Sequence, residues 1–164
     1  MKKLLYVLLP QRAYLMTLHR FFYLLYDLRV LKNKEAFKFH YFVQRIIEPD
    51  FVVIDIGANL GYFAKNFTRL AKNGKVVALE PLPQFHAVLN HFIGHLENME
   101  LHNVALGKEA GSITMVLPQT NGMIRTGLPH IIRPDEQNTT ERTQEVQMVN
   151  TADFFQTFER IDYI

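Results

Sequence analysis

The stretch Phe51-Val-Val-Ile-Asp-Ile-Gly-Ala-Asn-Leu-Gly-Tyr-Phe63 decides the fold class of this chain. Its first four residues are apolar and mostly β-branched, which predicts a strand buried on both faces. Asp55 stands where the chain would leave the sheet, and Gly57 and Gly61 bracket a turn into a helix. Glycines suit such a turn, because the backbone bends sharply and a ligand can approach the helix N-terminus without meeting a Cβ atom.

Strands and helices alternate after this turn. The hydrophobic pattern predicts a helix over residues 62–72, a second buried strand over 75–79, a helix over 83–96 and a third strand over 99–104. A turn is expected at 105–111. This alternation predicts a parallel sheet with right-handed crossovers.

The last third of the chain predicts two strands around a long polar excursion. Residues 112–117 and 144–149 alternate in the manner of strands, and residues 118–145 between them contain several glycines and prolines. A loop of this length is typical of functional segments. A short helix is expected at 151–159, and residues 161–164 begin another strand.

A second acidic residue, Glu80, follows the second predicted strand, about 20 residues after the glycine turn. A carboxylate at this place can accept hydrogen bonds from both hydroxyls of a ribose. Because the carboxyl ends of parallel strands meet at one edge of a sheet, Asp55 and Glu80 are expected to lie together. The sequence therefore predicts a nucleotide-type ligand at that edge.

The glycine spacing discriminates between nucleotides. An NAD site favours Gly-x-Gly-x-x-Gly, which packs backbone amides against a pyrophosphate, whereas Gly57 and Gly61 are spaced Gly-x-x-x-Gly. The acid Asp55 would repel a pyrophosphate but suits the ammonium group of an amino-acid tail. No Gly-Lys-Ser/Thr follows the turn, which excludes a P-loop. These features favour S-adenosyl-L-methionine (SAM) over NAD.

Together these residues resemble the FkbM-type SAM-dependent methyltransferases over about residues 50–164. The similarity rests on five segments: Val53-Ile-Asp-Ile-Gly-Ala-Asn-Leu-Gly-Tyr-Phe63, Val77-Ala-Leu-Glu-Pro81, Asn103-Val-Ala-Leu-Gly107, Val149-Asn-Thr-Ala-Asp153 and Ile161-Asp-Tyr-Ile164. The resemblance implies an α/β fold with a Rossmann-like class I SAM methyltransferase sheet. The family's Lys-x-Asp-x-Glu-Gly segment is expected just after Ile164, so the sheet is expected to be incomplete within these residues.

The resemblance also implies a function and a set of binding residues. The expected activity is methyl transfer from SAM to a hydroxyl of a sugar, glycan or small molecule, and the sequence does not identify a general base. The methionyl part would be held at the glycine turn, the ribose by the acid after the second strand, and the adenine beside the third strand. The cofactor-binding residues are thus Asp55, Gly57, Ala58, Asn59, Gly61, Glu80, Asn103 and Ala105.

Residues 1–50 are expected to form a helical N-terminal cap on the methyltransferase domain at residues 51–164. From about residue 11 to 31 the chain predicts an amphipathic helix with a broad apolar stripe. The stripe comprises Tyr14, Leu15, Leu18, Phe21, Phe22, Leu25 and Leu28. The expected polar seam comprises Arg12, His19, Arg20 and Asp27. A second helical pattern, carried by Phe37, Tyr41, Phe42 and Ile46, follows it.

Composition narrows the possible classes further. The chain has no cysteine, which excludes disulfides and thiolate zinc sites, and no metal site is predicted. Residues 1–50 carry nine Lys or Arg against four Asp or Glu, but these charges are dispersed, so nucleic acid is not an expected partner. A cytoplasmic location is expected. Contact of residues 1–31 with a membrane surface is a further option, ranked below packing on the sheet or a subunit.

Two other functions stay open at this stage. One is a non-catalytic nucleotide-fold module that acts through its basic amphipathic helix at a membrane or partner. The other is an NAD-dependent oxidoreductase, which the glycine spacing disfavours. The oligomeric state is not determined by the sequence.

Overall fold

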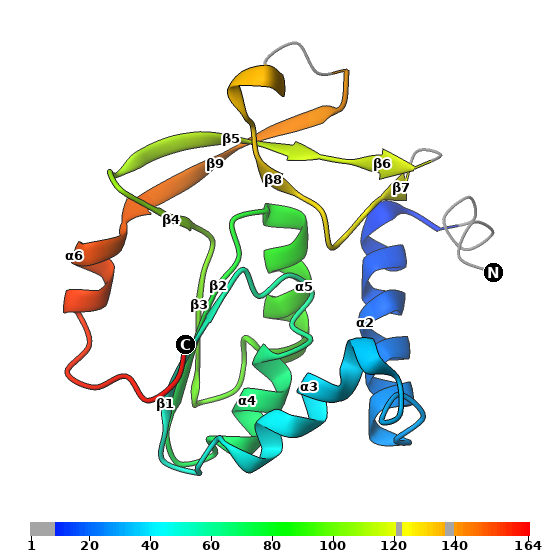
Figure 1. Cartoon of the computed structure of the whole chain (residues 1–164), viewed down its shortest axis with the longest axis vertical. Coiled ribbons are helices and arrows are strands. Elements are labelled where there is room, and N and C mark those ends of the chain that lie inside the picture. Colours follow the sequence, from blue (N-terminus) through cyan, green and yellow to red (C-terminus); the bar gives the residue numbers. More distant parts are fainter. Residues whose placement is uncertain (1–8, 121–122, 137–139) are drawn as a thin grey trace.

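A parallel three-stranded sheet forms the centre of the structure, a computed structural model that describes residues 9–120, 123–136 and 140–164 (Figure 1). Its strands are β1 (Val52–Ile56), β2 (Lys75–Leu79) and β3 (Met99–His102), and they lie in the order β1-β2-β3. All pairs are parallel, with Val53 opposite Val76 and Val76 opposite Met99. The predicted α/β fold class and its parallel sheet are confirmed.

Helices bury both faces of this sheet. They are α4 (Ala64–Leu70), α5 (Pro83–Ile93) and α6 (Thr151–Gln156). Along β2, Val76 and Ala78 contribute to the hydrophobic clusters under α4 and α5, whereas Val77 and Leu79 pack toward α6. Successive strand residues point to opposite faces, so a sheet covered on both sides needs a continuous apolar run. Figure 1 shows the resulting three layers.

The second side of β1 is contacted by the last residues of the chain. Tyr163 forms a parallel bridge with Val53, and its carbonyl oxygen accepts a hydrogen bond of 2.9 Å from the backbone N–H of Ile54. The Asp162 carboxylate accepts a further hydrogen bond of 2.8 Å from the N–H of Val52. The strand expected at 161–164 is thus present as a single bridge beside β1.

A second sheet, of four strands, lies across the carboxyl ends of the first one (Figure 1). Its strands are β4 (Ala105–Gly107), β5 (Gly111–Leu117), β8 (His130–Ile131) and β9 (Arg142–Asn150), in the order β4-β9-β5-β8. The excursion between β5 and β9 also contains the hairpin strands β6 (Gln119–Thr120) and β7 (Met123–Ile124) and the 3₁₀ turn η3 (Pro134–Glu136).

One sequence expectation in this region was wrong. Residues 105–107 were expected to turn, but they form β4, which pairs in parallel with β9. The polar stretch 118–145 was expected to be a loop or excursion; it is an excursion that contains paired strands, and Ile124 is buried beside Met115 and Val146. The apolar residues of this stretch are too few to show a periodic pattern. Their burial is therefore evident only from their packing against the rest of the fold.

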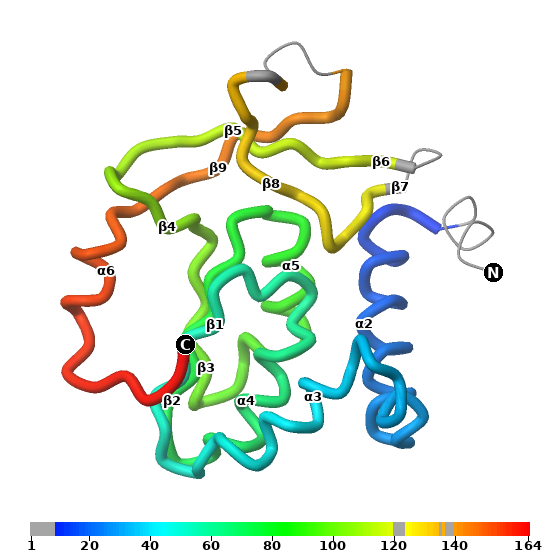
Figure 2. Tube along the Cα trace, in the orientation of Figure 1, coloured from blue at the N-terminus to red at the C-terminus, as the bar shows by residue number. Residues whose placement is uncertain are grey.

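The N-terminal region is helical over its described residues. Its elements are α2 (Gln11–Asp27), η1 (Glu35–Phe37), α3 (Lys38–Phe42) and η2 (Val43–Arg45). Helix α2 stands beside α5 and reaches the four-stranded sheet, as the tube in Figure 2 shows. Residues 1–8, with the basic pair Lys2 and Lys3, lie outside the described residues. Within the described part, no helix is long and apolar enough to span a bilayer.

The buried face of α2 differs from the expected stripe. Its buried residues are Tyr14, Leu15, His19, Phe22, Tyr23 and Tyr26. His19 was expected in the polar seam but is 1% exposed, whereas Phe21 and Leu28 were expected in the apolar stripe but are 46% and 65% exposed. Phe42, from the next helical pattern, is also half exposed. His19 follows Leu15 by four residues and precedes Phe22 by three, so its position lies on the buried face.

We predict that α2 contributes to folding stability through one face only. Leu15→Ala should lower the free energy of unfolding by about 2–5 kcal/mol, because it empties a fully buried site. The matched variant Leu24→Ala, on the exposed face of the same helix, should change it by less than about 0.5 kcal/mol. Urea denaturation measures both values. Equal losses would contradict the packing of α2 described above.

Candidate cofactor site

The glycine turn after β1 is tied to the carboxyl end of β2. The backbone N–H groups of Gly57 and Ala58 donate hydrogen bonds of 2.9 and 3.0 Å to the same acceptor, the carbonyl oxygen of Leu79. Asn103, just after β3, donates from its side-chain amide to the carbonyl oxygens of Glu80 and Pro81, at 2.8 and 3.0 Å. The ends of all three strands therefore meet at one edge, as the sequence predicted.

Glu80 lies at the centre of this edge and is 4% exposed. Its Oε2 accepts a hydrogen bond of 2.8 Å from the N–H of Asn59, and its Oε1 accepts one of 2.8 Å from the N–H of Leu82. Burial raises the pKa of the Glu80 carboxyl to about 7, while the two backbone hydrogen bonds act in the opposite direction. Each carboxylate oxygen has a second lone pair with which it can accept from a ligand hydroxyl.

Asp55 supplies the second carboxyl group of the site. The backbone N–H of Ala64, at the start of α4, donates to it, and its Oδ2 is shielded from solvent without a hydrogen-bond partner among the described residues. Burial, and then the nearby Glu80 charge, raise the pKa of Asp55 to about 7. A shielded, unpaired carboxylate oxygen is costly, and a cationic ligand group would satisfy it.

Asp55 also borders a small hollow. The hollow has a volume of about 190 Å³ and is lined by Phe39, Ile54, Asp55, Ile56, Phe63, Phe67, Tyr163 and Ile164. Aromatic and aliphatic side chains thus surround the carboxyl group on this side. Their low polarity explains why burial is the main cause of its raised pKa.

The two glycines of the turn have different roles. Both have positive φ values, +74° at Gly57 and +83° at Gly61, which favour glycine. A Cβ atom at Gly57 would meet no atom within 4 Å, so this residue presents open space to a ligand. A Cβ atom at Gly61 would lie 2.7 Å from Cδ2 of Leu89, so a larger residue there would have to displace this side chain of α5. Only Gly57 shows the open approach that the sequence suggested for both.

Ala58 and Asn59 complete the turn. Ala58 is 6% exposed and packs with Ala78 and Leu89. Asn59 has a positive φ of 54°, a conformation that asparagine tolerates better than most residues. Its Oδ1 accepts a hydrogen bond of 2.7 Å from the N–H of Leu60, and its amide donates to the carbonyl oxygen of Thr126. The Asn59 side chain therefore links the turn to the excursion.

Ala105 belongs to the four-stranded sheet. It lies in β4, opposite Met148 of β9, and is half-buried. With Asn103 two residues before it, Ala105 follows the carboxyl end of β3. The predicted site residues are therefore arranged around one edge, although Gly61, Ala58 and the Asn59 side chain contact mainly protein.

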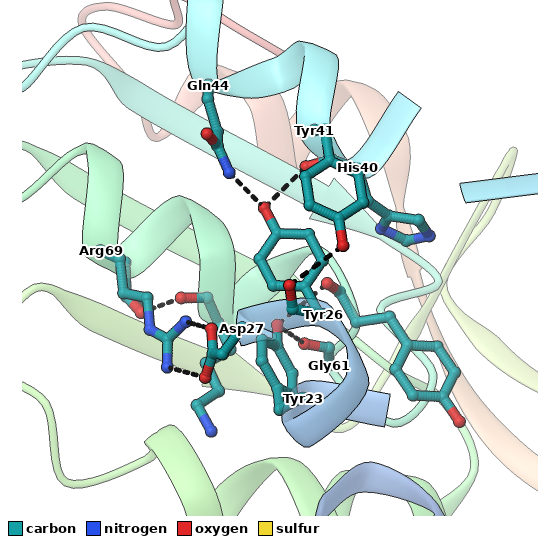
Figure 3. A network of polar contacts seen from close by, with 11 residues as sticks. Tyr23, Tyr26, Asp27, His40, Tyr41, Gln44, Gly61 and Arg69 are labelled. Atoms are coloured by element: carbon teal, nitrogen blue, oxygen red, sulfur yellow. Dashed lines mark hydrogen bonds and ion pairs between the residues drawn. The ribbon is translucent and has the colours of Figure 1, made fainter. Parts of the chain in front are cut away.

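The sequence missed two residues of α2 that hold the glycine turn. His19 is hydrogen-bonded through Nδ1 to the carbonyl oxygen of Leu60 at 2.6 Å. Burial lowers the pKa of His19 to about 4, so the ring is neutral at pH 7 and Nδ1 carries its single proton. The Tyr23 hydroxyl lies 3.1 Å from the carbonyl oxygen of Gly61 and 2.9 Å from that of Tyr62 (Figure 3). Neither contact has a sequence motif, because both acceptors are backbone atoms.

The chemistry of this edge fits SAM. The ligand carries an ammonium group, for which Asp55 offers a shielded oxygen, and a ribose, for which Glu80 offers two acceptors. Gly57 leaves the backbone open to close approach. A pyrophosphate would instead meet two carboxyl groups, which disfavours NAD.

Comparisons with known proteins identify similar chains. The chain is 32% identical to the 2-O-methyltransferase NoeI of Sinorhizobium fredii (strain NBRC 101917 / NGR234) over 85 residues, which are 51% of this chain and 35% of that protein. The chain thus spans about a third of the length of that relative. A SAM-dependent O-methyltransferase from Thermotoga maritima aligns with 68% of this chain and 65% of its own, with 15% identity and a TM-score of 0.35.

A match to a family model over a longer stretch of the chain shows which family the protein belongs to. The model of the methyltransferase FkbM domain matches residues 55–164, from the acid at the end of β1 to the bridge beside it. This range contains the glycine turn, Glu80 and Asn103. Because the match covers more than half of the chain, the protein belongs to the FkbM methyltransferase family.

Proposed function

We propose that this chain forms the SAM-binding part of an O-methyltransferase. The observation that carries the proposal is the buried carboxyl group of Glu80 together with the partly shielded carboxyl group of Asp55, on either side of the open Gly57 turn. SAM is the methyl donor that membership of the FkbM family implies. It supplies an activated methyl group on a sulfonium centre.

Each residue of the edge has a separate task in this proposal. Asp55 binds the ammonium group through its shielded oxygen, and Glu80 accepts hydrogen bonds from the ribose hydroxyls. Gly57 allows the methionyl part to approach the backbone. Asn103 and Ala105 flank the adenine side, where Asn103 also fixes the turn after β2. The protein would thus contribute mainly by holding reactants in alignment, which can lower a barrier substantially.

We propose a hydroxyl group of a sugar, glycan or small molecule as the methyl acceptor. The support is the similarity to NoeI, which is a 2-O-methyltransferase. A peripheral membrane contact through residues 1–31 is a further proposal. Its support is the exposed apolar face of α2, where Phe21, Leu24 and Leu28 are 46–65% exposed.

The ribose assignment is tested by Glu80→Gln. We expect calorimetry to show SAM binding to the wild-type chain and at least a tenfold weaker affinity for the variant, since a hydrogen bond to a charged acceptor contributes about 1.5–3 kcal/mol. Glu100→Gln, which removes a half-exposed carboxylate from β3, is the control and should leave the affinity unchanged.

Two results would overturn this part of the proposal. Equal SAM affinity in the wild type and Glu80→Gln would remove Glu80 from the ribose site. Displacement of SAM by NAD at comparable concentrations would favour an oxidoreductase. Circular dichroism and thermal unfolding of each variant separate a lost contact from a lost fold.

SAM affinity should rise with pH through neutrality. The pKa of Asp55 is raised to about 7, so below that pH the free protein is mostly neutral at this residue and must lose a proton to bind the ammonium. For one such group, affinity should increase about eightfold between about pH 6 and about pH 7.5 and level off above its pKa. Calorimetry across this range checks the slope, and Asp55→Asn should bind SAM more weakly and keep only the pH dependence that Glu80, whose pKa is also raised to about 7, contributes.

The contacts from α2 should also influence cofactor binding. Tyr23→Phe removes the hydroxyl that holds Gly61 and Tyr62, and we expect it to weaken SAM binding several-fold. Tyr26→Phe is a matched control, because the Tyr26 hydroxyl bonds the carbonyl oxygen of His40 instead. Both variants should lose about 1 kcal/mol of stability. If calorimetry gives the same SAM affinity for both, α2 supports the fold without positioning the turn.

A further inference from the structure

A second concave site lies away from the cofactor edge. It is an open groove of about 790 Å³ between the end of α2, the segment from α3 to η2, and α4. Asn66, Arg69 and Leu70 of α4 line it, whereas Asp55, Glu80 and the residues of the glycine turn do not. The groove therefore shares no lining residue with the cofactor edge.

The groove is strongly basic. Its charged lining residues are Asp27, Arg29, Lys32, Lys38, Arg45 and Arg69. Arg69 is paired with Asp27 through two contacts, of 2.8 and 3.4 Å, and Lys38 is paired with Glu35 at 2.5 Å. Arg29, Lys32 and Arg45 form no ion pair with a carboxylate of the described residues. Three positive charges are therefore available to a ligand.

A hydrogen-bond network holds the walls of the groove together. The Tyr26 hydroxyl donates to the carbonyl oxygen of His40 at 2.9 Å, and Tyr41 donates to that of Tyr26 at 3.0 Å (Figure 3). The Gln44 amide donates to the Tyr26 hydroxyl at 2.5 Å. These contacts join α2 to the segment from α3 to η2. Because the walls are fixed to one another, the basic side chains extend from a pre-formed frame.

The end of α2 places one of the cations by an unusual backbone conformation. Arg29 has φ +59°, and the following N–H, of Val30, bonds back to the carbonyl oxygen of Leu25 at 3.0 Å. This is the arrangement that commonly ends a helix with glycine in the left-handed position. Here the position carries a guanidinium group in place of a hydrogen atom. Glycine would be the least strained residue in this conformation, but the position holds an arginine, whose side chain is suited to bind anions.

We propose that this groove is a second binding site, specific for a phosphate-bearing ligand. Arginine forks match phosphate oxygens in pairs, and a lysine adds a compact third charge. A multiply charged phosphate group would neutralise Arg29, Lys32 and Arg45 together, whereas a single carboxylate would not. The volume exceeds that of an isolated ion and leaves room for the group that carries the phosphate.

Two sources can present such a phosphate: a soluble phosphorylated compound or the headgroup of an anionic lipid. The rim of the groove favours the lipid. Phe42 lines it at 49% exposure, and Leu28 and Val30, on either side of Arg29, are 65% and 55% exposed. Apolar side chains beside basic ones are typical of surfaces that rest on anionic bilayers.

The experiment uses the whole chain and two probes. The first is inorganic pyrophosphate, measured by calorimetry. The second is a set of phosphatidylcholine vesicles with or without phosphatidylglycerol, measured by flotation at low and high salt. The test variant is Lys32→Glu with Arg45→Glu. Its control is Lys108→Glu with Arg142→Glu, which makes the same change in net charge at two exposed residues, one just after β4 and one at the start of β9.

We expect the wild type and the control to bind at least one probe. The affinity of the test variant for that probe should be lower by a factor of about ten or more. Binding of the phosphatidylglycerol vesicles alone identifies a lipid, and binding of pyrophosphate alone identifies a soluble ligand. Binding of neither probe by the wild type, or equal losses in test variant and control, overturns the proposal. Thermal unfolding verifies that both variants fold, and Lys32→Gln with Arg45→Gln replaces the test variant if it does not. No step depends on SAM, so the proposed function can fail without affecting this result.

Discussion

The buried carboxylate of Glu80 is the constraint on which the cofactor edge depends. It accepts one backbone N–H from the turn after β1 and one from the turn after β2, so it joins two loops that the sheet alone would leave independent. A buried charge is tolerated only when such donors compensate it. The carboxylate that orders the two loops can therefore also accept hydrogen bonds from a ligand. The order of the two loops and the proposed ribose site thus depend on the same carboxyl group.

The excursion and α2 enclose this edge from two further directions. The excursion reaches the turn through the contact between Asn59 and Thr126, and α2 reaches it through His19 and Tyr23. Helix α2 lies outside the range that matches the FkbM domain, residues 55–164. The geometry of the family's turn is thus supported in this chain by a segment that the family model does not include.

The sequence predicted features that depend on neighbouring residues and missed features that depend on contacts between distant segments. The buried strands and the glycine turn follow from short patterns, because a strand covered on both faces must be apolar throughout. His19 was misplaced, since its polarity suggested a solvated position while its spacing from Leu15 placed it on the buried face. The sequence identified Gly61 as a turn residue. The contact that constrains this position is with Leu89, which lies in a helix far along the chain. The pairing of residues 105–107 with β9 has no local signal at all.

The hydrogen bonds from Tyr23 affect what a comparison of related sequences can reveal about the evolution of this protein. They end on the carbonyl oxygens of residues 61 and 62, which every amino acid provides. Side chains at the receiving positions can therefore change without breaking the contact, and no compensating change at residue 23 is required. A search for correlated substitutions among relatives would be blind to this link between α2 and the turn, even where selection preserves it strictly.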